Sequence, residues 1–310
     1  MKKIAFIFPG QGSQTVGMGK DFFENSDIAK DMIKEASKRI DVDFEKLLFE
    51  ANDDLEKTQF TQPAILLVSA IATKLIQEQI DIKPEFVLGH SLGEFSALVA
   101  SGAMNYLDGV EVVHKRGTFM NEACKGADAG MMAIIGLDDE KVIALCQEAR
   151  DDGKSVWPAN FNSDGQVVLA GKKADLEELV TTFKDAGAKR ALVLNMSVAS
   201  HCPMLELAVS NLDPYLGEFI NDDFDIPVVS NVTADKYSTK EEATELLKKQ
   251  LTSPVLYKQS IAKYAEDVDL IIELGNGKVL QGLNKRALKT PTVSVNDMAS
   301  LQKAIDLINE

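Results

Sequence analysis

A glycine-framed serine at a strand-to-helix junction limits the possible folds more than any other segment. Gly89-His90-Ser91-Leu92-Gly93 fits the pattern G-x-S-x-G. It follows an apolar run at 86–88 and precedes a helical segment at 94–100, which is the setting of a nucleophile elbow. The tight turn brings other backbone close to both flanking positions, where only glycine leaves room. The sequence therefore predicts an α/β sheet with Ser91 as an exposed nucleophile, in preference to a plain strand–helix turn.

Strand and helix signals alternate along most of the chain. Short apolar runs predict buried strands, and a 3.6-residue periodicity predicts the helices between them. Thr61 is expected to cap one long helix, with Pro63 just inside its start. This order indicates a parallel sheet with helices on its faces. The expected strands are 4–8, 85–88, 226–229 and 270–274, and the expected helices are 27–40, 62–79, 92–101, 105–123, 203–217, 240–250, 278–288 and 298–309.

The middle of the chain has a different order of elements. Strands are expected at 130–136, 155–162, 166–170 and 191–196, with helices at 138–150 and 175–186. The order β-α-β-β-α-β is that of a ferredoxin-like unit. We therefore expect a hydrolase-like α/β subdomain formed by 1–125 and 198–310, with a ferredoxin-like subdomain at 126–197 inserted into it.

Charge and cysteine content exclude several classes of protein. With 33 basic and 48 acidic side chains, the net charge of −15 disfavours binding to nucleic acid or to anionic membranes. The three cysteines are too few and too widely spaced for a disulfide framework or a metal site. The N-terminal apolar run ends at Pro9, too early for a signal peptide, and the stretch 64–73 is too short to span a bilayer. We expect a cytoplasmic protein and interpret the glycosylation motif at Asn231 as chance.

A serine nucleophile needs a base, and the sequence holds three histidines. His90 is adjacent to Ser91 and is expected to point elsewhere, while His114 lies within a predicted helix, where a structural or exposed role is expected. His201 follows the nucleophile in the chain, the order found in α/β-hydrolase sites, although a lone loop histidine is often only a surface residue. We predict His201 as the base and interpret the adjacent Cys202 as structural, because it lacks a glycine-framed turn.

The oxyanion of an acyl-transfer intermediate needs backbone N–H donors. Leu92, directly after the nucleophile, is one expected donor. The glycine-rich loop after the first strand is expected to supply the other, for which we choose Gln11. That loop does not match a dinucleotide-binding motif, because Thr15 stands where glycine is required, and 275–278 is not a Walker A motif, because no Ser or Thr follows Lys278. No permanently bound cofactor and no metal are expected.

At these residues the chain resembles the malonyl-CoA:acyl carrier protein transacylases of fatty acid synthesis. The likeness covers its whole length, and its motifs together are far more specific than the elbow alone. Three departures do not touch the predicted catalytic groups: Asn276 for a usual proline, Asn121 for a frequent glutamine, and Leu256-Tyr257 for a commoner basic–aromatic pair. The matching segments are 8–14, 61–64, 89–94, 115–117, 160–163, 166–171, 200–201, 250–255, 277–280 and 282–283.

The resemblance implies transfer of malonyl from coenzyme A to the phosphopantetheine thiol of acyl carrier protein, with malonyl-CoA as a substrate and not a resident cofactor. It also implies the hydrolase-like subdomain with a ferredoxin-like insert that the element order indicates. By motif match, Ser91 is the nucleophile, His201 is the base, and Gln11 and Leu92 are the oxyanion donors. Gln250 lies at the position that orients the histidine, by its side chain or its backbone carbonyl. A neutral residue there suits a malonate site, because a second anion would oppose binding.

Arg116 lies on the apolar side of its predicted helix, opposite a polar stripe that includes Glu111 and Lys115. A buried arginine needs an anionic partner or full hydrogen bonding. One interpretation is an internal salt bridge, or a side chain that reaches the helix edge. The other is a free fork that binds the malonyl carboxylate through two parallel hydrogen bonds, and the resemblance favours it.

The implied protein partner, acyl carrier protein, is acidic like this chain. Complementarity then calls for a local basic patch, unless the candidates are ordinary surface charges. Two rival functions remain, an esterase or thioesterase that uses the same serine and histidine, and an inactive carrier-binding scaffold. A hydrolase would expose its acyl-enzyme to water, and the joint presence of nucleophile, base and arginine disfavours the scaffold. The candidate patch residues are Lys189, Arg190, Lys285 and Arg286.

Overall fold

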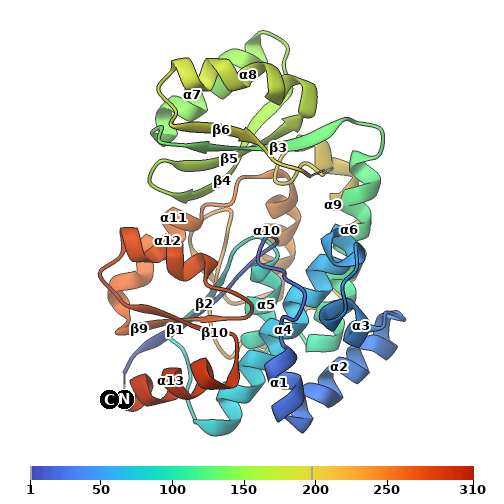
Figure 1. The fold of residues 1–310 in the computed structure, drawn as a ribbon, viewed down its shortest axis with the longest axis vertical. Helices are drawn as coiled ribbons and strands as arrows, with labels where there is room; N and C mark the ends of the chain where they lie inside the picture. Colours follow the sequence, from blue (N-terminus) through green and yellow to red (C-terminus); the bar gives the residue numbers. More distant parts are fainter. Residues whose placement is uncertain (1, 197) are drawn as a thin grey trace.

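The computed structural model describes residues 2–196 and 198–310 and contains two β-sheets. A six-stranded sheet with the order β10-β9-β1-β2-β7-β8 forms the centre of the larger part, and a four-stranded sheet with the order β4-β5-β3-β6 belongs to the smaller part. Figure 1 shows the smaller part, with helices α7 and α8, stacked on one end of the larger. The predicted α/β class with two unlike subdomains is confirmed.

The larger sheet is parallel except at one edge. Its strands are β1 (Ile4–Phe8), β2 (Phe86–Gly89), β7 (Val228–Val229), β8 (Lys236–Tyr237), β9 (Leu270–Leu274) and β10 (Thr292–Val295). The predicted parallel sheet is present, and β8, which was not predicted, adds an edge strand that pairs antiparallel with β7 through a short connection. Strands β1 and β2 are parallel neighbours, so the loops at their carboxyl ends meet. The N–H of His90 accordingly donates to the Phe8 carbonyl at 3.0 Å.

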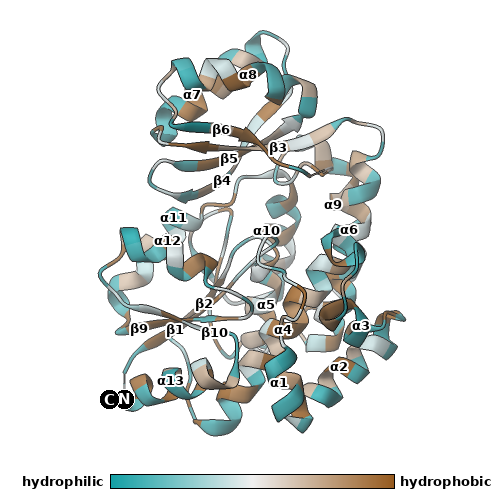
Figure 2. Ribbon diagram, in the orientation of Figure 1, coloured by the Kyte–Doolittle hydropathy of each residue, from teal (hydrophilic) through white to brown (hydrophobic). Residues whose placement is uncertain are grey.

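Both faces of the larger sheet are buried. Alternate residues of β1 pack into different apolar clusters: Phe6 and Phe8 pack with α4 and α5, whereas Ile7 packs with α11 and α12. Apolar residues mark the central strands in Figure 2. The α-helices of this part are α1 (Lys20–Asn25), α2 (Asp27–Ile40), α3 (Phe44–Phe49), α4 (Thr58–Gln79), α5 (Gly93–Ala100), α6 (Tyr106–Cys124), α9 (Glu206–Phe219), α10 (Lys240–Thr252), α11 (Tyr257–Tyr264), α12 (Val279–Ala287) and α13 (Met298–Asn309), and the 3₁₀ turns are η1 (Asp54–Glu56), η2 (Pro203–Leu205) and η3 (Ala265–Asp267).

The smaller part has the ferredoxin-like arrangement. Its elements are β3 (Ala129–Ile135), α7 (Asp139–Asp151), β4 (Val156–Ser163), β5 (Gln166–Lys172), α8 (Lys173–Asp185) and β6 (Arg190–Val193). Every neighbouring pair is antiparallel, and a separate apolar core lies between this sheet and its two helices. We retain 126–197 as the proposed extent of the insert. Residue 197 and Met1, which bound the predicted subdomains, lie outside the described residues.

Helix α4 begins earlier than predicted. Thr61 is not its N-cap, because the helix starts at Thr58 and the Thr61 hydroxyl donates to the Leu55 carbonyl at 2.6 Å. Pro63 has no N–H for the carbonyl of Gln59, which accepts instead from His114 Nδ1 at 2.8 Å. The helix is long and apolar enough to cross a membrane, but 83% of its most apolar window is buried inside the fold. It is a core helix of the larger part.

A short backbone pairing joins the two parts beside the predicted site. The N–H of Val255 donates to the Ala159 carbonyl at 2.8 Å, and the N–H of Phe161 donates to the Val255 carbonyl at 2.9 Å. Val255 follows the end of α10, which carries Gln250. Lys258 on α11 adds an ion pair with Asp139 at the start of α7. Strand β4 is therefore docked on the segment that follows Gln250.

Candidate active site

Ser91 lies on a strained turn between β2 and α5. Its φ angle of 53° is left-handed, a conformation that is costly for a residue with a side chain. A Cβ atom at Gly89 would lie 1.8 Å from the backbone carbon of Gly93, and one at Gly93 would lie 2.2 Å from the Phe8 oxygen. The buried Asn231 side chain fastens this turn, because it accepts from the Ser91 N–H at 2.7 Å and donates to the Gly89 carbonyl at 2.6 Å. The predicted elbow geometry is present.

Ser91, His201 and Gln250 form a hydrogen-bonded chain. Ser91 Oγ lies 2.7 Å from His201 Nε2, and His201 Nδ1 lies 2.6 Å from the backbone carbonyl oxygen of Gln250. A carbonyl oxygen only accepts, so Nδ1 carries the proton and Nε2 presents its lone pair to the serine hydroxyl. The backbone of Gln250, and not its side chain, faces the imidazole.

His201 is held as a neutral base. Burial, together with the positive charge of Arg116, lowers the pKa of His201 to about 3. At saturating malonyl-CoA we therefore expect the acylation rate of Ser91 to stay level from about pH 8 to about pH 5 and to fall only below that. Stopped-flow acylation, with circular dichroism to exclude acid unfolding, measures this profile. A fall centred near pH 6.5, where an exposed histidine titrates, would contradict it.

Arg116 reaches the serine from α6 and is 2% exposed. Its Nη1 donates to Gln62 Oε1 at 2.7 Å, and its Nη2 donates to Gln250 Oε1 at 3.0 Å and to Ser91 Oγ at 3.3 Å. Among the described residues its hydrogen-bond partners are thus amide and hydroxyl oxygens, and its buried Nε has none. Burial lowers the pKa of Arg116 to about 10, so it stays a cation at neutral pH. Within the described part of the chain, Arg116 therefore makes no direct salt bridge, and both of its Nη atoms are held by protein oxygens.

A cavity of about 140 Å³ opens beside these groups. Gln11 and Leu92, the predicted oxyanion donors, both line it, as do Ser91, Arg116 and His201. A neighbouring cavity of about 670 Å³ shares Gln11 and extends between the first loop, α4 and the chain after β6. The site residues predicted from the sequence therefore gather in one place. The four basic residues proposed for docking are exposed on β6, the residue before it, and α12.

Sequence reasoning missed three buried polar residues of the site. Gln62 binds Arg116 from α4, and Glu94 and Asn231 lie beneath the nucleophile turn. Gln62 falls within a matched segment, and Glu94 ends the elbow motif, but neither had an expected role. Asn231 was interpreted as a chance glycosylation motif, and its 0% exposure excludes modification in the folded protein. Polar residues inside apolar surroundings were the only available signal.

The remaining candidates have structural partners. His90 Nε2 lies 2.7 Å from Asn162 Oδ1 on β4, so His90 links the elbow to the smaller part. His114 bonds the backbone of α4. Cys202 is fully buried and burial raises its pKa to about 12, so its thiol stays protonated and is a poor nucleophile. These placements agree with the roles expected for His90, His114 and Cys202.

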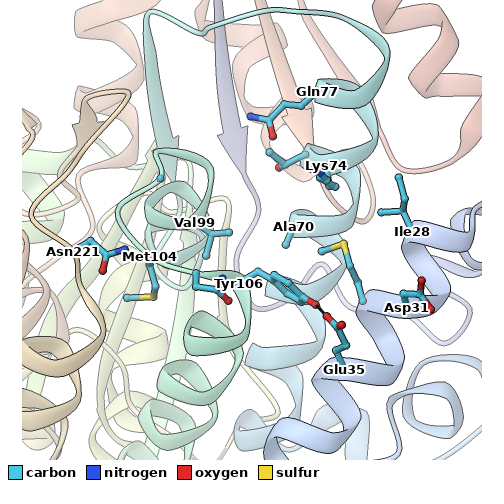
Figure 3. Close-up of a pocket in the computed structure, with 14 residues that line it drawn as sticks. Ile28, Asp31, Glu35, Ala70, Lys74, Gln77, Val99, Met104, Tyr106 and Asn221 are labelled. Carbon is cyan, nitrogen blue, oxygen red and sulfur yellow. Dashed lines mark hydrogen bonds between the residues drawn. The ribbon is translucent and has the colours of Figure 1, made fainter.

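A separate surface cavity lies away from Ser91. Figure 3 shows this cavity of about 580 Å³, between α2, α4 and the start of α6, where the Tyr106 hydroxyl donates to Glu35. Of the described residues that line it, none belongs to the predicted site. Within residues 2–196 and 198–310, no group of three or more His, Cys, Asp or Glu side chains is placed to hold a metal ion.

Comparison with known proteins agrees with this geometry. The acyl transferase domain model matches residues 5–306. A malonyl CoA-acyl carrier protein transacylase of Bacillus subtilis is 40% identical over 313 residues, covering 100% of this chain and 98% of that protein. One of the same name from Escherichia coli K12 is 40% identical over 310 residues, covering 99% and 100%.

Solved structures agree as well. The crystal structure of malonyl-CoA:acyl carrier protein transacylase from Helicobacter pylori has a TM-score of 0.97 and 46% identity, covering 100% of this chain and 99% of that one. A malonyl-transacylase solved with its type II PKS acyl-carrier protein has a TM-score of 0.94 and 38% identity, covering 98% and 99%. These likenesses confirm the resemblance that the motifs predicted. With a match over nearly its whole length and a serine–histidine pair at the elbow, the chain belongs to the acyl transferase family.

Proposed function

We propose that the protein transfers malonyl from malonyl-CoA to the thiol of acyl carrier protein in fatty acid biosynthesis, through a malonyl-Ser91 intermediate. One observation carries the proposal: a buried arginine, hydrogen-bonded to amide and hydroxyl oxygens and not to a carboxylate, lines the cavity that holds a hydrogen-bonded serine–histidine pair. A simple esterase for neutral acyl groups has no use for that cation, whereas a malonyl carboxylate neutralises it.

Each half of the reaction uses the same groups. Ser91 Oγ attacks the thioester carbonyl while His201 Nε2 takes the hydroxyl proton, and the C–S bond breaks with return of that proton to the leaving coenzyme A thiolate. Gln11 and Leu92 line the cavity where the oxyanion forms, and we assign their N–H groups to it. The carrier thiol then attacks the malonyl-serine and gives its proton to His201. Ser91 recovers that proton as it leaves the acyl group.

The second substrate decides between transferase and hydrolase. The H. pylori and B. subtilis proteins are named transacylases, and the solved complex contains an acyl-carrier protein. A transferase protects its acyl-enzyme until the carrier thiol arrives. We further propose that the protein works in the cytoplasm, where its three free, buried cysteines remain reduced.

The proposal is tested by intact-protein mass spectrometry. Mixing with malonyl-CoA should add one malonyl group, the adduct should persist in buffer, and acyl carrier protein should remove it while becoming malonylated. Loss of the adduct to water at the same rate with and without the carrier would identify a hydrolase. If no adduct forms at all, the inactive carrier-binding scaffold is the remaining candidate function.

Carrier docking gives a separate prediction. Reversal of charge at Lys189 and Arg190, or at Lys285 and Arg286, should raise the Michaelis constant for acyl carrier protein by roughly three- to tenfold, because it removes attraction to an acidic partner. Malonyl-CoA acylation should be unchanged. Charge reversal at Lys34 and Lys38, exposed on α2, is the matched control. Equal effects in all three double variants would show that net charge, and not a basic patch, matters.

A further inference from the structure

A buried carboxyl group with no assigned role lies beneath the nucleophile. Glu94 follows Ser91 by three residues, in the first turn of α5, and is 0% exposed. Its Oε2 accepts from Gln250 Nε2 at 2.7 Å and from the Asn231 N–H at 3.2 Å, and its Oε1 accepts from the Tyr237 hydroxyl at 3.0 Å. All three partners donate to it, which is the arrangement that favours an ionised carboxylate.

Glu94 determines which way the Gln250 amide faces. A side-chain amide has one accepting end and one donating end. Because Glu94 accepts from Nε2, Oε1 is turned toward Arg116 Nη2, 3.0 Å away. The same Nε2 also donates to the Ser91 carbonyl at 3.0 Å. Through one amide, Glu94 therefore positions both the arginine and the nucleophile turn.

Glu94 is also the counter-charge of Arg116. The guanidinium, the Gln250 amide and the carboxylate form a hydrogen-bonded chain in which the amide separates two buried opposite charges. A malonyl carboxylate at Arg116 would place two anions around one cation, and like charges in a shared buried site are not both retained without cost. The neutral Gln250 thus does not leave the malonate site free of a second anion, as the sequence suggested, because Glu94 lies one amide away.

The groups that face Glu94 leave one route for relieving this repulsion. They are Arg116 from α6, Tyr237 from β8, and the amides of Gln250 and Asn231. Gln250, Asn231 and Tyr237 are the hydrogen-bond partners of Glu94. Of these three donors, only the Tyr237 hydroxyl can also accept a hydrogen bond. A proton on Glu94 Oε1 can then be donated to the Tyr237 oxygen without disturbing the Gln250 amide. Burial, opposed by these hydrogen bonds and by Arg116, raises the pKa of Glu94 to about 7.

We propose that Glu94 is a positioning residue that holds the Arg116 fork through Gln250 and takes up a proton when a carboxylated acyl group binds. This inference rests on the proposed malonyl transfer. Its consequence is a selectivity for malonyl that weakens as the pH rises, because an ionised Glu94 competes with malonate for the charge of Arg116. Binding of acetyl groups, which bear no carboxylate, does not involve Glu94.

The test compares Glu94→Gln with the wild type. The glutamine oxygen replaces Oε2, and its NH₂ replaces Oε1 and donates to the Tyr237 oxygen. The hydrogen bond to Tyr237 is thereby reversed, as in protonated Glu94, the other two are kept, and the charge is lost. Between about pH 6.5 and 8.5, the wild-type KM for malonyl-CoA should rise about tenfold and that of the variant should stay flat. The inhibition constant of acetyl-CoA should be level in both. Glu273→Gln removes a different buried carboxyl, on β9, whose two oxygens cap α12. It controls for loss of a buried charge and, once circular dichroism shows that it is folded, should keep the wild-type profile.

A second measurement does not need the Glu94 variant to fold. Calorimetry of malonyl-CoA binding to Ser91→Ala, in buffers of different ionisation enthalpy, should show uptake of a fraction of a proton near pH 7.5, and acetyl-CoA should show none. Zero uptake, or parallel malonyl profiles in wild type and Glu94→Gln, would overturn the role of Glu94. Absence of a malonyl adduct on the wild-type protein would instead overturn the proposed function.

Discussion

Ser91→Ala should abolish the covalent malonyl adduct and lower transfer to acyl carrier protein by roughly 10⁴- to 10⁶-fold. The Ser91 hydroxyl lies on the strained turn, 2.7 Å from His201 Nε2. Removal of its oxygen leaves the cavity, Arg116 and the proposed oxyanion donors in place, but no nucleophile remains to attack the thioester. Intact-protein mass after incubation with malonyl-CoA measures the adduct, and a coupled assay measures the rate.

Ser200 provides the matched control for this substitution. It lines the same cavity and precedes His201 in the chain. Ser200→Ala should still form the adduct, and peptide mapping should place the malonyl group on the peptide that contains Ser91. An adduct that survives in Ser91→Ala would show that another residue carries the acyl group.

Arg116→Ala should separate malonyl from acetyl transfer. The lost charge-assisted contact contributes about 1.5–3 kcal/mol, which corresponds to a roughly ten- to hundredfold fall in malonyl kcat/KM. Acetyl transfer should be spared or improved, because that group has no carboxylate to pair. Arg116→Lys should restore only part of the malonyl rate, since lysine is a point charge without the planar fork. Both half-reactions are measured with each acyl-CoA.

A pH profile and a control variant distinguish a role of Arg116 in acyl selection from a purely structural role. The positive charge of Arg116 helps to lower the pKa of His201, so its removal should shift the acid limb of the acetyl profile to higher pH. Lys115→Ala removes the neighbouring cation on the same helix. It should change neither the ratio of malonyl to acetyl transfer nor the acid limb of the acetyl pH profile. If Arg116→Ala lowers malonyl and acetyl transfer by one common factor in a folded protein, Arg116 does not select the acyl group.

The parts of this fold that carry strong periodicity were predictable. The buried strands β1 and β2 are continuous apolar runs, β9 is apolar except for Glu273, and the ferredoxin-like order followed from alternating strands and helices in the middle of the chain. Strands β8 and β10 were missed because they are only two and four residues long at the sheet edges, where no apolar run is needed. Helix α11 was missed as well, since its eight residues give too little periodicity.

The site was predictable wherever function depends on a side chain within a recognisable motif. The nucleophile, base and arginine were found in this way, and the structure places them together. The part of Gln250 that faces the imidazole is a backbone carbonyl, which every residue possesses, so the sequence left two alternatives. Glu94 was missed because its importance lies in partners on α10 and β8 that only the folded chain brings near.

The pairing of β4 with Val255 has a consequence for protein engineering. Exchange of ferredoxin-like inserts between relatives is an obvious way to alter acyl preference, because the insert lines the cavity through Asn160 and Val168. Strand β4 of the insert also pairs with Val255, just after Gln250 in the chain. The backbone carbonyl of Gln250 fixes the tautomer of the His201 base. A chimaera joined only at the two ends of the insert would pair a foreign strand with the recipient's 250–257 segment. A chimaera should therefore take both the insert and the 250–257 segment from the same donor protein, although the two are separate in the sequence.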